Sequence, residues 1–123
     1  MVEKYLKAKV EELLPNLAGS IFPGAAPEHT AVPYAVYTCT GASAETALTP
    51  GSALNTESIQ LDFFTATYKE AKGYFDTMKA ALVDYRGDLC GFPVQRIKLV
   101  NAMDGYEPLA LVQRATVEYD ITY

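Results

Sequence analysis

The chain has 123 residues, of which 50% are hydrophobic, and its formal net charge is −5. This length predicts a single domain, residues 1–123, and the composition is too apolar for a disordered chain. The acidic balance argues against a surface that binds duplex nucleic acid, because such binding depends on Lys and Arg; no apolar run reaches the length of a membrane span and no export signal is visible.

An amphipathic helix is predicted at the N-terminus. Its apolar residues recur every three or four positions, which is the spacing of one helical face. They are Val2, Leu6, Val10, Leu13 and Leu17. Pro15 should end or kink the helix near Leu14, because proline lacks an N–H and clashes with the preceding turn. Residues 23–33 are punctuated by Pro and Gly and predict a loop, with at most a brief strand at Ile21 and Phe22.

Two strands follow, separated by a long connection. Residues 34–40 are β-branched, aromatic or small, which favours a strand. Strand character returns near Glu57, and residues 59–66 alternate between a core face and a partly polar face. Between the strands, residues 41–55 are small and polar, include a Pro50-Gly51 turn and show no sustained period. We therefore expect a mobile connection there.

A second helix is predicted to begin at Thr67. Thr67 and Glu70 have the spacing of a capping box, in which each side chain satisfies a free backbone N–H at a helix start. The predicted buried stripe consists of Ala71, Phe75, Met78, Leu82 and Tyr85. Gly87 offers the left-handed position that commonly follows a helix end.

Strands are predicted over the rest of the chain. Residues 89–90 form a short strand, residues 91–93 a turn and residues 94–101 a longer strand. Asp104-Gly105 is a strong hairpin signal, after which a final strand runs over about residues 109–123. The order of elements predicts an α+β fold, with a mainly antiparallel sheet and two helices packed on one face.

No catalytic site, metal site or cofactor is predicted. His29 lies in the Pro-rich loop without a nearby Cys or second His, and the glycines form no phosphate-binding motif. Cys39 and Cys90 have neither metal-ligand spacing nor a CxxC pattern, which favours reduced thiols in a cytoplasmic setting and leaves a disulfide between them open. Three tyrosines are expected in the core: Tyr34, Tyr74 and Tyr119.

Acidic charge is concentrated in the first half of the chain. No Lys or Arg lies between Lys9 and Lys69. The carboxylates in that interval are Glu11, Glu12, Glu28, Glu45, Glu57 and Asp62. This half should repel nucleic acid, although ordinary solvated carboxylates explain the pattern as well as a functional acidic surface does.

Three segments bear on function together. They are IFPGAAPEHTAVPYAVYT (residues 21–38), IQLDFFTATYKEAKGYFDTMKAALVDYRG (residues 59–87) and DGYEPLALVQRATVEYDITY (residues 104–123). In order and spacing they resemble a family of small phage proteins, long labelled as a domain of unknown function, that includes tail-completion or tail-terminator proteins of siphophages. The resemblance implies a ring, usually six-fold, that caps the head-proximal end of the tail tube, stops its polymerisation and presents a surface to the neck. It implies no catalytic residue and no cofactor.

The expected partners follow from that resemblance. They are further copies of the chain in a homohexameric ring, the tail tube protein and a neck or head-completion protein, with DNA only passing through the channel and no membrane. The protein would act in the host cytoplasm during assembly and then in the virion. The candidate interface residues are Glu45, Leu48, Leu54, Asp104, Tyr106 and Glu107.

Two alternatives stay open. The nearest is another ring-forming tail or neck component, such as a tube subunit or a head-side connector. The other is a small-molecule-binding domain or enzyme that uses Cys90 or His29 as its reactive group.

Overall fold

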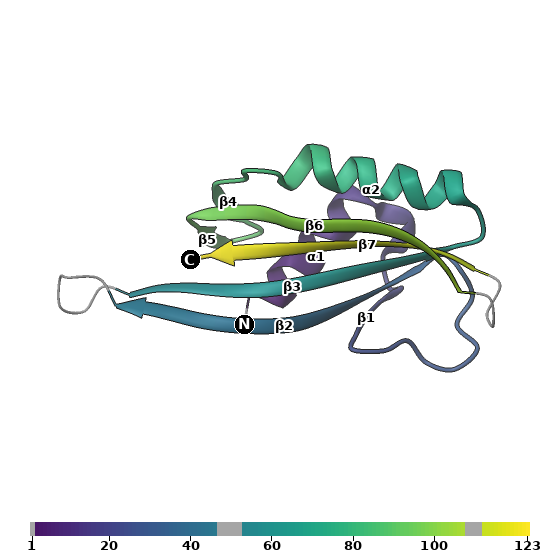
Figure 1. Ribbon diagram of the computed structural model, residues 1–123, viewed down its shortest axis with the longest axis horizontal. Coiled ribbons are helices and arrows are strands. Elements are labelled where there is room, and N and C mark those ends of the chain that lie inside the picture. Colours follow the sequence, from purple (N-terminus) through teal and green to yellow (C-terminus); the bar gives the residue numbers. More distant parts are fainter. Residues whose placement is uncertain (1, 47–52, 108–111) are drawn as a thin grey trace.

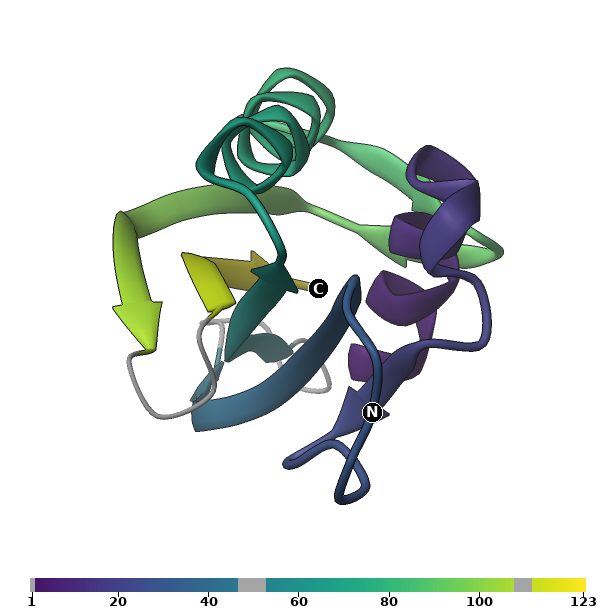
Figure 2. The same ribbon diagram turned by 90° about the vertical axis from the view of Figure 1, so that its right-hand side faces the viewer.

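A five-stranded sheet with two helices on one of its faces forms the body of the molecule (Figures 1 and 2). The computed structural model describes residues 2–46, 53–107 and 112–123. In spatial order the strands are β1 (Ile21–Pro23), β2 (Tyr34–Thr46), β3 (Ala53–Thr65), β7 (Val112–Thr122) and β6 (Arg96–Glu107). β1 runs parallel to β2, and the other neighbours are antiparallel. The predicted α+β fold is confirmed.

Both helices begin close to where the sequence placed them, but the second ends at Leu82, earlier than predicted, and Gly87, the predicted stop, lies in a strand. Helix α1 covers Glu3–Leu13 and stops before Pro15, which opens a short 3-10 helix, η1, over Pro15–Leu17. Helix α2 covers Tyr68–Leu82, and the Oγ1 of Thr67 accepts a hydrogen bond from the backbone N–H of Glu70 at 3.2 Å. The predicted cap at Thr67 is confirmed, because this bond satisfies one of the N–H groups that a helix start leaves free.

The buried face of α2 is turned slightly from the predicted stripe. Tyr74 is buried, whereas Phe75 and Tyr85 are only partly buried. The hydroxyl of Tyr74 accepts a hydrogen bond from Asn16 Nδ2 at 2.5 Å and donates one to Glu70 Oε1 at 3.2 Å. This polar link lets a tyrosine close the contact between α2 and η1 without leaving its hydroxyl unpaired.

The core lies between the helices and the inner faces of β3 and β7. Phe63 and Tyr119 are the largest fully buried side chains. Ile59 and Leu61 of β3 alternate with polar residues, so the strand has one apolar and one polar face. Burying one such large side chain stabilises the fold by about 1.5–3 kcal/mol. The core positions predicted for Tyr74 and Tyr119 are confirmed.

The opposite side of the sheet, which we call the open face, carries no helix among the described residues. It displays Ser58, Gln60, Asp62 and Phe64 of β3 and Arg114, Thr116, Glu118 and Asp120 of β7. Hydrogen bonds join neighbouring strands across it, from Ser58 Oγ to Asp120 and from Thr116 Oγ1 to Asp62, both at 2.5 Å. Tyr34 lies here and stacks on Phe64, with ring centroids 4.8 Å apart. The prediction of a core position for Tyr34 was wrong.

The predicted connection over residues 41–55 is largely strand. β2 and β3 stay paired as far as Glu45 opposite Leu54 and Thr46 opposite Ala53. The small residues have weak strand preference on their own, but a paired neighbour satisfies their backbone groups and overrides it. Residues 47–52, which include the predicted Pro50-Gly51 turn and Leu48, lie outside the described residues.

The predicted hairpin turn at Asp104-Gly105 was also wrong. β6 continues through both positions, with Asp104 opposite Ala115 and Gly105 opposite Arg114. A Cβ on Gly105 would lie 3.3 Å from Arg114 Nη2, so the glycine makes room for that side chain instead of forming a turn. The link between β6 and β7 falls in residues 108–111, outside the described part of the chain.

A small second hairpin forms from β4 (Gly87–Leu89) and β5 (Phe92–Val94). Its turn lies at Cys90 and Gly91, both with positive φ, and so begins earlier than the predicted turn over residues 91–93. Phe92 stacks on Tyr5 of α1, with ring centroids 4.7 Å apart. This contact ties the hairpin to the helical side of the molecule.

Tyr119 offers a test of the core. Its hydroxyl is buried without a hydrogen-bond partner among the described residues, and burial raises the pKa of its phenol. We expect Tyr119→Phe to raise the free energy of unfolding by about 1 kcal/mol, because it removes an unsatisfied polar group. Tyr119→Ala, the control, should lower it by about 3–5 kcal/mol. Urea unfolding of the purified variants measures both; a destabilised phenylalanine variant would contradict the unpaired hydroxyl.

Candidate functional site

The pairing of β2 with β3 extends beyond the rest of the sheet. β7 contributes its last backbone pair through Tyr123, which exchanges N–H···O bonds of 2.8 Å with Asn55. We call residues 41–46 of β2 and residues 53–55 of β3 the arm. Its last two pairs, Glu45 with Leu54 and Thr46 with Ala53, lie beyond the last pair that β3 makes with the C-terminal strand, and its tip projects from the body at the left of Figure 1. Of the predicted interface residues, the arm places Glu45 directly opposite Leu54.

The outer edge of β2 is covered only in part. β1 pairs with Ala35–Tyr37, and no described strand pairs with that edge from Thr38 to Thr46. Nine residues of backbone therefore lie at an edge that could accept another strand.

The other edge of the sheet carries most of the exposed apolar side chains. Of five exposed large hydrophobic residues among those described, three lie on β6 and a fourth lies beside it. We call these four, with Asp104, the β6 strip: Tyr68, Val100, Met103, Asp104 and Tyr106. The four apolar members are each 48% to 53% exposed. Exposed aromatic and Met side chains gathered on one edge are typical of an interaction surface.

Polar contacts hold one end of the β6 strip in place. The hydroxyl of Tyr68 donates to Asp104 Oδ2 at 3.0 Å, and Lys72 Nζ lies 3.6 Å from the same oxygen. Both partners come from the first turns of α2. The strip is thus supported by a helix whose start is itself fixed by a side-chain cap.

The structure brings together two of the predicted interface residues on this strip. Asp104 and Tyr106 are exposed on β6, and Glu107 is its last residue. Tyr68, Val100 and Met103 were not predicted as interface residues. Their exposure depends on the position of β6 at the edge of the sheet and on a bulge between Leu99 and Asn101. The spacing of apolar residues in the sequence indicates neither the edge position nor the bulge.

A cavity of about 660 Å³ opens on the open face beside β2. Residues 24–30 form one wall, and Tyr34, Val36, Asp62 and Phe64 form the other. The imidazole of His29 is exposed, with Nε2 3.7 Å from Glu28 Oε1. That geometry pairs His29 with a neighbouring surface carboxylate, and among the described residues it places no nucleophile in hydrogen-bond contact with the imidazole.

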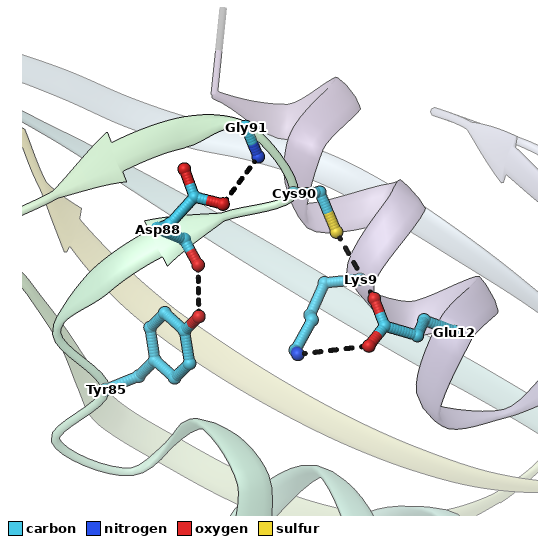
Figure 3. Close-up of polar contacts among 6 residues, drawn as sticks. All are labelled: Lys9, Glu12, Tyr85, Asp88, Cys90 and Gly91. Carbon is cyan, nitrogen blue, oxygen red and sulfur yellow. Dashed lines mark hydrogen bonds and ion pairs between the residues drawn. The ribbon is translucent and has the colours of Figure 1, made fainter.

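Cys90 does not have the surroundings of a reactive thiol. Figure 3 shows its Sγ pointing towards Glu12 of α1, and the S–H donates to Oε2 at 3.6 Å. Partial desolvation against α1 raises the pKa of the Cys90 thiol, and the hydrogen bond and negative charge of Glu12 add to this, while Lys9 opposes it. Catalytic thiols have lowered pKa values. Cys39 and Cys90 are both free thiols.

The acidic interval of the sequence does not form one surface in the fold. Glu57 is buried and accepts a hydrogen bond from the backbone N–H of Val2 at 3.0 Å. Glu12 lies on α1 with Lys9 3.6 Å away, and Asp62 lies on the open face. Within the described ranges, no three His, Cys, Asp or Glu side chains gather as metal ligands, and none of the described helices is long and apolar enough to cross a membrane.

One family model matches nearly the whole chain. The family model described as Tail completion protein gp17 matches residues 6–123. A chain in the solved structure "Virion of native gene transfer agent (GTA) particle" is similar in fold, with a TM-score of 0.64 and 17% sequence identity. The match covers 98% of this chain and 96% of that chain. A search of curated proteins gave no match.

The contact between Cys90 and Glu12 can be tested by alkylation in a Cys39→Ser background. Glu12→Gln should lower the pKa of the Cys90 thiol and speed alkylation at neutral pH, because it removes the charge that favours the protonated form. Lys9→Met should have the opposite effect. The pH dependence of iodoacetamide labelling reports both, and an unchanged midpoint in Glu12→Gln would show that the contact is not formed.

Proposed function

The chain belongs to the tail completion protein gp17 family, and we propose from this premise that it is a structural subunit of the tail of a phage or phage-like particle. In this proposal it forms a ring, six-fold by the family resemblance, at the head-proximal end of the tail tube. The ring ends polymerisation of the tube and joins the tail to the neck.

The observation that carries the proposal is the family match over residues 6–123, nearly the whole chain. The fold shared with a chain of a gene transfer agent virion supports a place in a particle of this kind. The raised pKa of the Cys90 thiol and the exposed imidazole of His29 give little support to the enzyme alternative. A non-enzymatic role therefore fits both the family and the surroundings of these two residues.

The proposed mechanism is geometric. Identical subunits close into a ring when each contact joins two different patches through a rotation that returns to its start. The arm and the β6 strip provide two such patches, since they belong to opposite edges of one sheet. One face of the ring must bind the end of the tube, and the other face must not bind a further ring of tube subunits, so that stacking stops.

The proposed partners are further copies of the chain, the tail tube protein and a neck or head-completion protein. DNA would pass through the channel without specific binding. Assembly would take place in the host cytoplasm, and the protein would remain in the virion. A tube subunit or a head-side connector would share the ring, and only its position in the particle separates these roles.

Position can be measured directly. Imaging of assembled particles that carry a tagged copy of the protein should show the tag at one junction between tail and head. Particles lacking the protein should carry tubes of uncontrolled length, because nothing stops stacking. A tag distributed along the whole tube would contradict the terminator role and favour a tube subunit.

Charge gives a second expectation. Six copies of a chain with net charge −5 carry a formal charge of −30, so passing DNA should be repelled and not held. The assembled ring should show no binding to duplex DNA in fluorescence anisotropy, even at low salt. A ring in which Glu118 and Asp120 are replaced by Lys serves as the positive control. Salt-sensitive binding by the unchanged ring, or a channel lined by Lys and Arg in a particle structure, would overturn the expectation.

A further inference from the structure

We propose that the arm of one copy pairs with the outer edge of β6 in the next copy, so that the sheet continues from subunit to subunit. This inference rests on the proposed ring and specifies the contact that closes it. It joins the two groups of candidate interface residues, because Glu45 and Leu54 lie on the arm and Asp104 and Tyr106 lie on β6.

Apart from the bulge between Cys39 and Gly41, the outer edge of β2 lacks the usual protection of an edge strand. Proteins block bare edges with Pro, with charged side chains, especially Lys, or with a covering segment. Thr38–Thr46 contains no Pro, Lys or Arg, and its one charged residue is Glu45. β1 covers only Ala35–Tyr37. The rest of the edge is therefore a template for another strand.

The outer edge of β6 is similarly open towards its end. Near its start, the N–H of Ile97 donates to the carbonyl oxygen of Tyr85 at 2.9 Å. The N–H of Ala102 donates to Asn101 Oδ1, also at 2.9 Å. Because outward groups recur at every second residue, the N–H groups of Asp104 and Tyr106 also point outward. The exposed side chains of the β6 strip flank these positions and supply the apolar contact that backbone pairing alone lacks.

Strand direction permits the junction. β2, β3, β7 and β6 alternate in direction, so β2 and β6 run antiparallel to each other. A second copy added by rotation about an axis to which the strands are tilted by less than 90° keeps its strand directions and therefore presents its β2 antiparallel to the first copy's β6. Pairing of β6 with β6 about a two-fold axis is also antiparallel, but it closes a dimer and leaves both arms unused.

The two open edges lie at different levels of the sheet. Thr38, where the open part of β2 begins, lies in the same cross-strand row as Asn101 of β6. From that row the open part of β2 extends in one direction, towards the level of Arg96. The open part of β6 extends in the opposite direction, towards Glu107. Pairing the open parts therefore shifts neighbouring copies along the strands, as happens when a sheet closes with tilted strands. This explains why the arm extends beyond the rest of its own sheet.

Cross-linking in assembled particles tests the contact. The background is Cys39→Ser with Cys90→Ser, which removes both native thiols. Ser43 and Met103 are exposed and lie on the open-face side of β2 and β6. We expect a short bismaleimide to join copies carrying Ser43→Cys to copies carrying Met103→Cys, and the double variant to give a ladder that ends at a closed ring. Val83→Cys, at an exposed apolar residue away from the strip, replaces Met103→Cys in the control and should give no ladder.

The possible outcomes distinguish failure of this proposed contact from failure of the proposed ring. Cross-linking of Met103→Cys copies to one another would indicate two-fold β6 pairing and overturn the proposal. Linking of Met103→Cys to Ala26→Cys in place of Ser43→Cys would move the contact to the cavity beside β2 and also overturn it. A ring seen by imaging without the Ser43–Met103 link rejects the contact and keeps the proposed function, whereas protein spread along the tube rejects the function.

A backbone variant tests the pairing independently of side-chain chemistry. Tyr106→Pro removes an outward N–H at an edge, where proline is tolerated. The free variant should keep the circular dichroism and melting temperature of the wild type but fail to complete tails. Met103→Asp should behave in the same way, while the matched control Val83→Asp should assemble normally. Normal rings from a folded Tyr106→Pro variant would overturn the proposal.

Discussion

The antiparallel pairing of β3 with β7 is the interaction on which the rest of the structure depends. Thr56–Thr65 pairs with Gln113–Thr122 without a break in register. Because side chains alternate along both strands, this register turns the apolar residues towards the helices and the polar residues towards the open face. A slip of one residue would exchange the two faces, so the burial of Phe63 and Tyr119 fixes the register as well as stabilising the fold.

The irregularities of the sheet lie outside this central pair. β2 shifts register between Cys39 and Gly41, and β6 shifts between Leu99 and Asn101. Bulges bend and twist the strands that carry them, so the outer strands depart from the regular centre. A sheet that does not close on itself must leave two edges. In this molecule short β1 covers only part of one edge, and the other edge carries exposed apolar side chains.

The sequence predicted the features that depend on neighbours in the chain. The cap at Thr67 was predicted because a helix start needs a hydrogen-bond acceptor that lies nearby in the sequence. The two faces of the sheet were predicted because the alternation of apolar and polar residues can be seen within a single strand. Residues 41–46 and 53–55 were misjudged because their backbone partners lie on the opposing strand. Asp104-Gly105 was misjudged because a turn dipeptide can also lie in a paired strand. Tyr106 was predicted as an interface residue and is exposed, whereas the exposure of Met103 was not predicted, since only the order of strands reveals which strand lies at the edge.

The size of the edge surfaces bears on where the proposed ring assembles. The β6 strip offers only four half-exposed apolar side chains on one edge. Cross-strand side-chain pairs contribute about 0.2–1 kcal/mol each, against a cost of about 4–15 kcal/mol for bringing two molecules together. A single edge contact is therefore weak. In a ring every subunit makes two such contacts, the closing contact is intramolecular, and a tube end that holds several subunits raises their effective concentration. On this argument the proposed ring is favoured at a tube end over dilute free solution, which is the behaviour that the proposed terminator role requires.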